Sequence, residues 1–248
     1  MKTEYGFKIA ALLSVGVLVV LAAAMLGQKV DAAPASGGSI SGTIKLDGTP
    51  PHQKPIDMSK EPSCAAIHKD KPITTEGVVT SASGGLANVV VYVSQGLTGN
   101  EASEISSEPA SITQKGCQYI PHVVVLDAGQ HMKVINDDQT SHNIHPQPVK
   151  NSEWNKSQPP GAPPFDVTWA NEEIAVPVKC NIHPWMHGYI AVVKGPYGIS
   201  DDSGSFSLNL PPGSYTLTAW QEVYGAQTQA VTVAAGKPAT ANFTFKAK

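Results

Sequence analysis

The chain has 248 residues, of which 41% are hydrophobic and 15% charged, enough for one large or two small domains with apolar cores. Its formal net charge of -3 comes from 17 basic and 20 acidic residues, and every basic residue is a lysine. Because guanine and phosphate recognition depends largely on arginine forks, the mild acidity and the lack of arginine argue against a nucleic-acid partner.

The amino terminus has the composition of an export segment. Lys2 and Lys8 precede an apolar run over residues 9–26, and the small-residue sequence Ala-Pro-Ala follows at 33–35. This order predicts that residues 1–35 contain a hydrophobic helix, which serves either as a cleaved signal peptide or as a membrane anchor through its apolar run. The rest of the chain is then exported to the periplasm or another extracytoplasmic part of the cell envelope. A buried core helix is the alternative, and the unbroken run at the extreme terminus disfavours it.

The remainder of the chain has the pattern of an all-β protein. Its 22 Gly and 20 Pro residues separate many short runs rich in Val, Thr and Tyr. Alternating apolar positions predict strands at residues 39–46, 88–94, 122–128, 131–137, 173–180, 189–195, 204–210, 215–221, 230–235 and 240–245. We expect a short helix near Cys64 and a long loop over the Pro-, Gln- and Ser-rich segment 150–165.

The outer segments of this all-β region share a pattern. GGSISGTIKLDGTPP near the start and DDSGSFSLNLPPGSYTLTAWQE near the end resemble the prealbumin-like regulatory domains found beside carboxypeptidases. The resemblance implies a β-sandwich built from two halves, residues 38–97 and 196–246. Residues 98–195 are then a second domain, inserted in the sandwich or joined to it in series.

Three cysteines in an exported chain leave one thiol unpaired. Cys64 and Cys117 lie in polar, loop-like stretches, so they are the predicted disulfide pair and Cys180 is the free thiol. A disulfide closing such a long loop stabilises a fold by roughly 4 kcal/mol in the chain-entropy account. The spacing also permits a Cys2His2 zinc site with His68 and His122, or two more free thiols.

The motif CNIHPWM carries three metal-binding side chains at regular spacing. Cys180, His183 and Met186 follow one another at intervals of three residues, so one tight loop can turn all three toward a common point. The upstream segment NDDQTSHNIHP offers His142 and His145. Two imidazoles, one thiolate and a weak thioether form the ligand set of a trigonal copper site with a long axial bond, whereas zinc favours harder ligands than methionine. Taken singly, a buried cysteine and a core-filling methionine are the ordinary alternatives.

These two motifs closely resemble those of the cupredoxins, the blue-copper proteins, and the short loop is most similar to the amicyanin type. The resemblance covers roughly residues 112–195 and implies a Greek-key β-sandwich with one type 1 copper. It implies His142, Cys180, His183 and Met186 as ligands. It also implies that Asn143 ties the two ligand loops together and directs its backbone N–H at the thiolate.

The same resemblance implies electron transfer to a redox partner protein. We expect one ring edge of His183 to face solvent, with Pro184 and Trp185 beside it as a small apolar docking patch. No open coordination position or nucleophile motif is evident, so we do not expect an enzyme. The alternatives are an envelope copper-delivery protein that uses the same residues, and an adhesive or carbohydrate-associated scaffold in which the outer sandwich carries the function.

The remaining histidines lack partners in the sequence. His145 is disfavoured as a ligand, and His187 is expected at the solvated rim of the site. His52, His68 and His131 are expected to be ordinary surface histidines.

Overall fold

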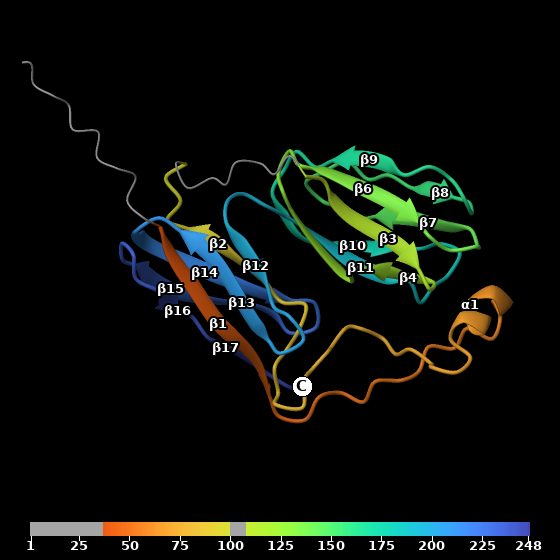
Figure 1. Cartoon of the computed structure of the whole chain (residues 1–248), viewed down its shortest axis with the longest axis horizontal. Coiled ribbons are helices and arrows are strands. Elements are labelled where there is room, and N and C mark those ends of the chain that lie inside the picture. Colours follow the sequence, from red (N-terminus) through yellow and green to blue (C-terminus); the bar gives the residue numbers. More distant parts are fainter. Residues whose placement is uncertain (1–36, 100–107) are drawn as a thin grey trace, which may run out of the picture. The chain divides into compact units, whose positions relative to one another are not determined.

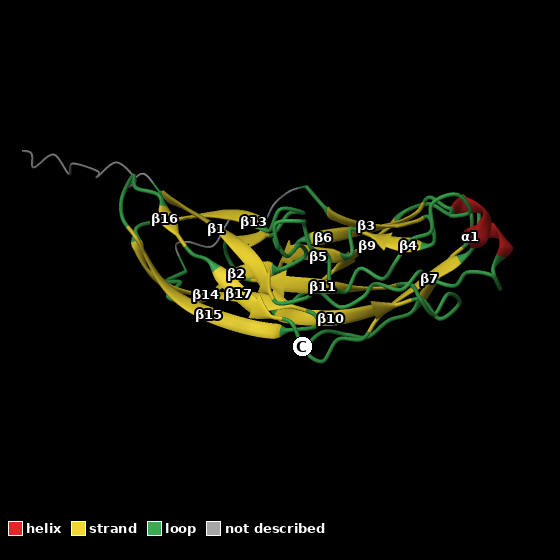
Figure 2. Cartoon of the chain, turned by 90° about the horizontal axis from the view of Figure 1, so that it is seen from below, coloured by secondary structure: helices red, strands yellow, loops and turns green. Residues whose placement is uncertain are grey.

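Alternation of apolar and polar residues sets the strands of this protein. In β13 (Ser205–Leu210), SFSLNL, every second side chain is buried, and the same pattern runs through most of β1 (Gly38–Asp47). The computed structural model describes residues 37–99 and 108–248. Strands make up nearly all the regular structure of this part of the chain (Figure 2). The all-β class is therefore confirmed.

Eight strands form the outer sandwich. One sheet has the order β13-β1-β16, with β17 also paired to β1, and the other has the order β12-β2-β14-β15. The strands not yet bounded are β2 (Val90–Gln95), β12 (Tyr197–Ile199), β14 (Gly213–Gln221), β15 (Gly225–Val233), β16 (Ala239–Thr240) and β17 (Phe243–Lys246). In Figure 1 the orange β1 lies beside blue strands from the end of the chain. Gly42 lets β1 pass close to Ala241, because a Cβ at Gly42 would lie only 1.6 Å from the carbonyl oxygen of Ala241.

Nine strands form the inner sandwich, which is drawn in green and teal in Figure 1. Its sheets have the orders β5-β11-β10-β7-β8 and β4-β3-β6-β9. The strands are β3 (Ala110–Lys115), β4 (Gln118–Ile120), β5 (Val123–Asp127), β6 (His131–Asn136), β7 (His142–Pro146), β8 (Lys156–Gln158), β9 (Phe165–Thr168), β10 (Glu173–Lys179) and β11 (His187–Val193). Their inward side chains form a core separate from that of the outer sandwich. A smaller apolar cluster combines residues of both sandwiches, including Val90 and Val123.

The ten predicted strands are all present, with ends that differ by a few residues. Seven short strands were missed: β3, β4, β7, β8, β9, β12 and β16. The expected loop over 150–165 is wrong in part, because it contains β8 and the first residue of β9.

The connection between β1 and β2 packs on the inner sandwich. It contains α1 (Pro62–Ile67), the expected short helix, which begins with proline at a position where a missing N–H costs nothing. Cys64 in this helix forms a disulfide with Cys117, so the predicted pairing is confirmed and the zinc alternative is wrong. Both cysteines are fully buried in the inner core, not in the polar surroundings expected from the sequence.

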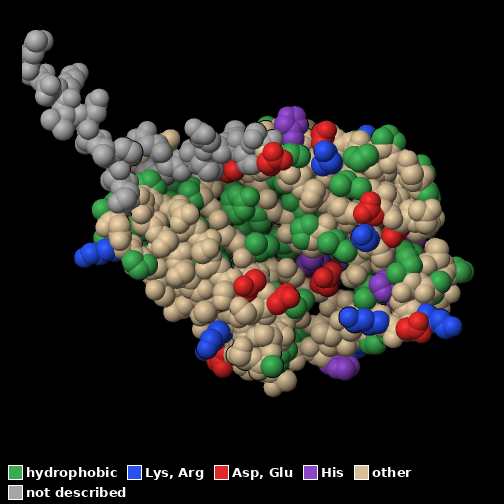
Figure 3. Space-filling model, in the orientation of Figure 1, with side chains coloured by type: hydrophobic (Ala, Val, Ile, Leu, Met, Phe, Trp, Pro, Cys, Tyr) green, Lys and Arg blue, Asp and Glu red, His purple; other side chains and the backbone are tan. Residues whose placement is uncertain are grey.

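The predicted amino-terminal helix lies outside the described residues. Within residues 37–99 and 108–248, no helix is long and apolar enough to cross a membrane. On the face drawn in Figure 3, charged side chains are scattered singly or in small groups among uncharged atoms.

A buried carboxylate holds the loop after β7 against β10. Glu173 is 6% exposed and accepts hydrogen bonds from the backbone N–H groups of Val149, Lys150 and Asn151. Burial by itself raises the pKa of Glu173, but these hydrogen bonds, with that of the Asn151 side chain, outweigh burial and hold the pKa below its ordinary value. The ionised carboxylate therefore stabilises the folded state.

Replacing this carboxylate should reduce stability in a pH-dependent manner. Since the folded-state pKa lies below the unfolded one, the stabilisation is complete above the unfolded pKa, about 4.3, and is lost as the pH falls below it. We expect Glu173→Gln to lower the free energy of unfolding by about 1–3 kcal/mol at neutral pH and by less in acid. Urea denaturation at both pH values measures this. The adjacent Glu172→Gln is the control, and an equal loss in both variants would contradict the role of Glu173.

Candidate metal centre

A tight loop joins β10 to β11 and carries three of the predicted ligands. Cys180 directly follows β10, and its backbone N–H donates to the Met186 carbonyl at 3.1 Å. The Met186 N–H in turn donates to the His183 carbonyl at 3.0 Å, and the His183 N–H points at the Cys180 sulfur at 3.4 Å. The loop therefore closes on itself around the thiol.

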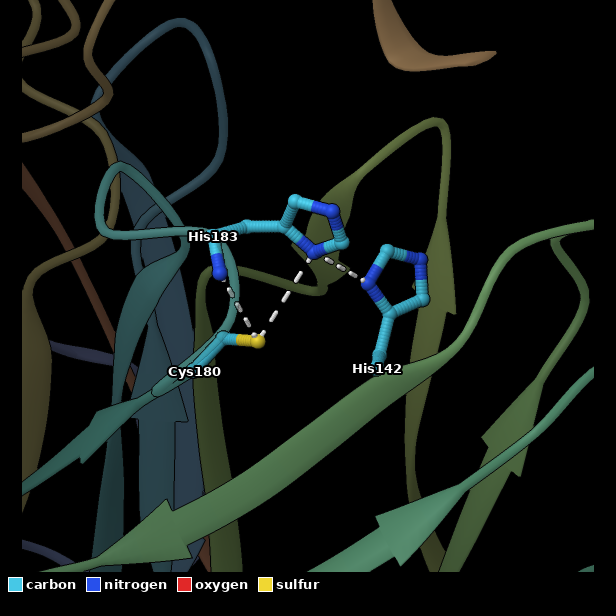
Figure 4. A group of neighbouring side chains, drawn as sticks. All are labelled: His142, Cys180 and His183. Carbon is cyan, nitrogen blue, oxygen red and sulfur yellow. Dashed lines mark hydrogen bonds between the residues drawn. The ribbon is translucent and has the colours of Figure 1, made fainter. Parts of the chain in front are cut away.

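Strand pairing brings His142 to this loop. β7 pairs with β10 through His145 and Lys179, which places the first residue of β7 near the end of β10. The Nδ1 atoms of His142 and His183 lie 2.9 Å apart, and the Cys180 sulfur lies 3.8 Å from His183 Nδ1 (Figure 4). The Nδ1 atoms of both imidazole rings therefore point toward the space beside the Cys180 sulfur.

The residues present fit a bound transition-metal ion. One donor atom from each of His142, Cys180 and His183 lies within 4.8 Å of the others. Ligand atoms that share one first-row ion at about 2.0–2.3 Å lie roughly 3–4 Å from one another. The histidines are fully buried, and Cys180 is 3% exposed and not part of a disulfide. Met186, 2% exposed, belongs to the same core cluster as Cys180.

The environment of Cys180 favours its thiolate form. Burial by itself raises the pKa of the Cys180 thiol, but hydrogen bonds from His142 and from the backbone N–H groups of Asn143 and His183 outweigh burial and lower that pKa. Because a thiolate and not a thiol binds metals, this shift prepares the sulfur as a ligand.

Asn143 links the two segments that carry the donors. Its Oδ1 accepts a hydrogen bond from the Asn181 N–H at 2.7 Å and lies 3.3 Å from the Cys180 sulfur. Its carbonyl oxygen accepts the Tyr119 hydroxyl at 2.6 Å. These contacts connect β7, β4 and the loop, and they restrict movement of the donors.

Asp138 is a site residue that the sequence analysis missed. Its Oδ2 lies 2.8 Å from His142 Nε2, and its two oxygens accept the N–H groups of Gly116 and Cys117, each at 2.7 Å. Gly116 and Cys117 form the two-residue turn between β3 and β4, both with positive φ, as a type I′ hairpin requires. Burial alone raises the pKa of Asp138, but these hydrogen bonds lower it, so the carboxylate is ionised.

The contact with Asp138 also fixes the tautomer of His142. Because an ionised carboxylate accepts but does not donate, Nε2 of His142 carries a proton, and Nδ1 is the nitrogen left to bind a metal ion. Burial by itself lowers the pKa of His142, but hydrogen bonds to Asp138 and Cys180 raise it. The disulfide therefore connects to the candidate ligand through Cys117 and Asp138.

The predicted exposure of His183 is wrong. Its side chain is fully buried, because the connection between β1 and β2 covers the ring edge expected to face solvent. Glu61, in this connection, has Oε2 at 3.8 Å from His183 Nε2, and that buried nitrogen has no hydrogen-bond partner among the described residues. Burial lowers the pKa of His183, which favours the neutral ring that a metal requires.

The expected docking patch is only partly at the surface. Pro184 is exposed, whereas Trp185 is half-buried and its indole N–H donates to the Cys117 carbonyl at 3.1 Å. Ile182, which the sequence analysis did not single out, is 45% exposed.

The other histidines agree with expectation only in part. His187 is half-buried beside His122, not at a solvated rim, and His68 hydrogen-bonds the Gly116 carbonyl at 2.7 Å. His145 contacts Glu153 Oε1 at 2.6 Å and Asn181 Oδ1 at 3.2 Å. His52 and His131 are exposed, as expected.

Comparison with known proteins finds similarity in two parts of the chain. Residues 194–246 match the family described as the carboxypeptidase regulatory-like domain. No curated protein matches the chain.

Part of the chain is similar in structure to copper proteins. Amicyanin from Paracoccus versutus is 15% identical over 42% of this chain and 97% of its own, with a TM-score of 0.31. A purple cupredoxin from Nitrosopumilus maritimus is 22% identical over 34% of this chain and 99% of its own, with a TM-score of 0.29. The copper-containing nitrite reductase NirK of Thermus scotoductus SA-01 is 18% identical over 40% of this chain, with a TM-score of 0.33, and the match spans only 25% of the reductase.

Proposed function

We propose that this protein is an exported electron carrier with one type 1 copper, held by His142, Cys180, His183 and Met186. The observation that supports the proposal most strongly is the convergence of two histidine Nδ1 atoms and a thiolate-favouring cysteine in one buried space. Two imidazoles, a thiolate and a weak axial thioether are the ligands of blue-copper electron-transfer sites. Bound copper would supply a one-electron couple between its two oxidation states.

The surrounding residues hold the donors in a fixed arrangement. His142 begins β7, Cys180 directly follows β10, and Asn143 hydrogen-bonds Asn181 in the loop after Cys180. Asp138 orients His142 and excludes the alternative tautomer. Donors held by hydrogen bonds and buried packing rearrange little when the charge at the centre changes by one.

A redox partner would approach the surface formed by the loop. Pro184 and Ile182 are its exposed apolar side chains, and they lie on either side of the buried His183 in sequence. A small apolar surface of this kind suits the brief contacts of electron-transfer proteins. We propose this exposed pair, instead of the His183 ring edge, as the contact surface.

The confirmed disulfide supports an extracytoplasmic location, because such bonds persist in oxidising compartments. We further propose that residues 98–195 are a cupredoxin domain inserted between the halves of a prealbumin-like sandwich, residues 38–97 and 196–246. The separate cores of the two sandwiches support this division.

Voltammetry of the copper-loaded chain tests the proposal. We expect a reversible one-electron wave that leaves copper bound. In Asp138→Asn, the loss of a negative charge next to His142 destabilises the oxidised state, so we expect the potential to rise by about 60 mV, which corresponds to a tenfold shift in relative affinity.

The neighbouring Asp137 provides the control. It carries the same charge, but its half-exposed side chain pairs with Lys115 at 3.8 Å. Asp137→Asn should leave the potential nearly unchanged. Release of copper on reduction would contradict the electron-carrier function and favour copper delivery, whereas equal shifts in both variants would exclude a specific effect of Asp138.

A further inference from the structure

A second group of metal-binding side chains shares no residue with the Cys180 centre. His122 directly precedes β5, and His187 is the first residue of β11. Glu222 lies in the turn between β14 and β15, and Glu76 lies in the connection between β1 and β2. The group therefore combines residues from both sandwiches.

The donor atoms of this group converge. His122 Nε2 lies 2.9 Å from Glu222 Oε2, and one donor atom each from His122, His187 and Glu222 lies within 4.8 Å of the others. The two imidazole rings are nearly perpendicular, with centroids 5.4 Å apart. On the other side of the His122 ring, Glu76 Oε2 lies 3.8 Å from Nδ1.

Two members of the group are shielded from solvent, whereas the side chain of Glu76 is 39% exposed. The side chains of His122 and Glu222 are only 3% and 7% exposed. His187 Nδ1 lies 2.9 Å from the Trp185 carbonyl oxygen, which can only accept. The proton of His187 is thus on Nδ1, and the lone pair on Nε2 is free for a metal ion.

This arrangement matches a known kind of cation site. Two neutral imidazoles and one carboxylate are a common zinc ligand set.

We propose that His122, His187 and Glu222, flanked by Glu76, form a second metal site for Zn2+. Glu222 comes from the outer sandwich and both histidines from the inner one, so the ion would cross-link them. Because His187 follows Met186, the ion would also fix the end of the loop that carries Cys180.

Zinc titration of the full chain tests this site. The chain is first loaded with copper and then titrated with Zn2+, and bound metals are counted after dialysis. We expect one zinc per chain, and a higher thermal unfolding temperature with zinc than without it. Glu222→Gln keeps the size of the side chain and an acceptor for His122, yet it should weaken zinc binding at least about tenfold.

Two further variants complete the test. His187→Gln should weaken zinc binding in the same way, while His52→Gln, at an exposed histidine, should leave it unchanged. Glu222→Gln leaves Cys180 intact. The difference in zinc affinity between this variant and the unaltered chain therefore measures the second site, whether or not copper is bound at the first. No zinc beyond the Cys180 centre, or equal zinc affinity in all variants, would overturn the proposal and leave the group as a hydrogen-bonded ion network.

Discussion

Cys180→Ser is expected to abolish stable copper binding. Serine keeps the size of the side chain, but its hydroxyl stays neutral where the lowered pKa of the thiol favours the anion. Loss of an outer-shell partner usually weakens metal binding by about 10–100-fold, and loss of the anionic ligand itself should cost more. Competition against a chelator of known copper affinity measures the loss.

Met186→Leu is the matched control for this substitution. Leucine fills the same buried space but lacks the sulfur, and it leaves the two histidines and the thiolate in place. We expect this variant to retain copper, because a thioether would be the weakest of the four proposed ligands. Equal copper affinity in Cys180→Ser and the unaltered chain would contradict the assignment of Cys180 as a ligand.

Removal of the disulfide should cause the largest loss of stability. The bond between Cys64 and Cys117 joins residues 53 positions apart, and a loop of that length corresponds to about 4 kcal/mol of stabilisation. The double variant Cys64→Ala/Cys117→Ala should therefore unfold at much lower urea concentration. The loss should also weaken the cover over His183, because Glu61 directly precedes the helix that the disulfide fixes.

Reduction of the Cys64–Cys117 disulfide in the unaltered chain provides a second way to remove the cross-link. The reduced chain and the double variant should have similar free energies of unfolding. Protection of His183 from modification by diethyl pyrocarbonate should fall in both. A double variant within about 1 kcal/mol of the native chain would show that packing of Met58 and α1, and not the disulfide, holds this connection in place.

Several of the strands that the sequence predicted alternate clearly over five or more residues. β13 and β6 alternate strictly, since one face of each meets an apolar core. β8 and β16 have only three and two residues, too short to show a period. β7 was missed because HNIHP is polar by composition, yet four of its five residues are buried. Its burial follows from its pairing with β8 and β10, which no local pattern encodes.

The candidate site could be predicted where its residues are close in sequence. Cys180, His183 and Met186 lie in one seven-residue loop, so their spacing alone indicated a common centre. Asp138 acts through a contact with His142 that depends on the turn between β6 and β7, and no motif signals it.

Contacts between distant segments were not predictable. The burial of His183 arises from a segment more than a hundred residues earlier, around Glu61. The group of His122, His187 and Glu222 also depends on contacts between distant segments, because Glu222 contacts His122 only after both sandwiches have formed. Such contacts depend on tertiary packing, which periodicity and spacing do not describe.

The visible absorption spectrum of the copper-loaded full chain, recorded through one cycle of reduction and reoxidation, tests the central claim most directly. Copper bound by the Cys180 thiolate, His142 and His183 predicts an intense sulfur-to-copper charge-transfer band that disappears on reduction and returns on reoxidation. A chain that binds copper without this band, or that binds no copper, would contradict the proposed electron-transfer centre.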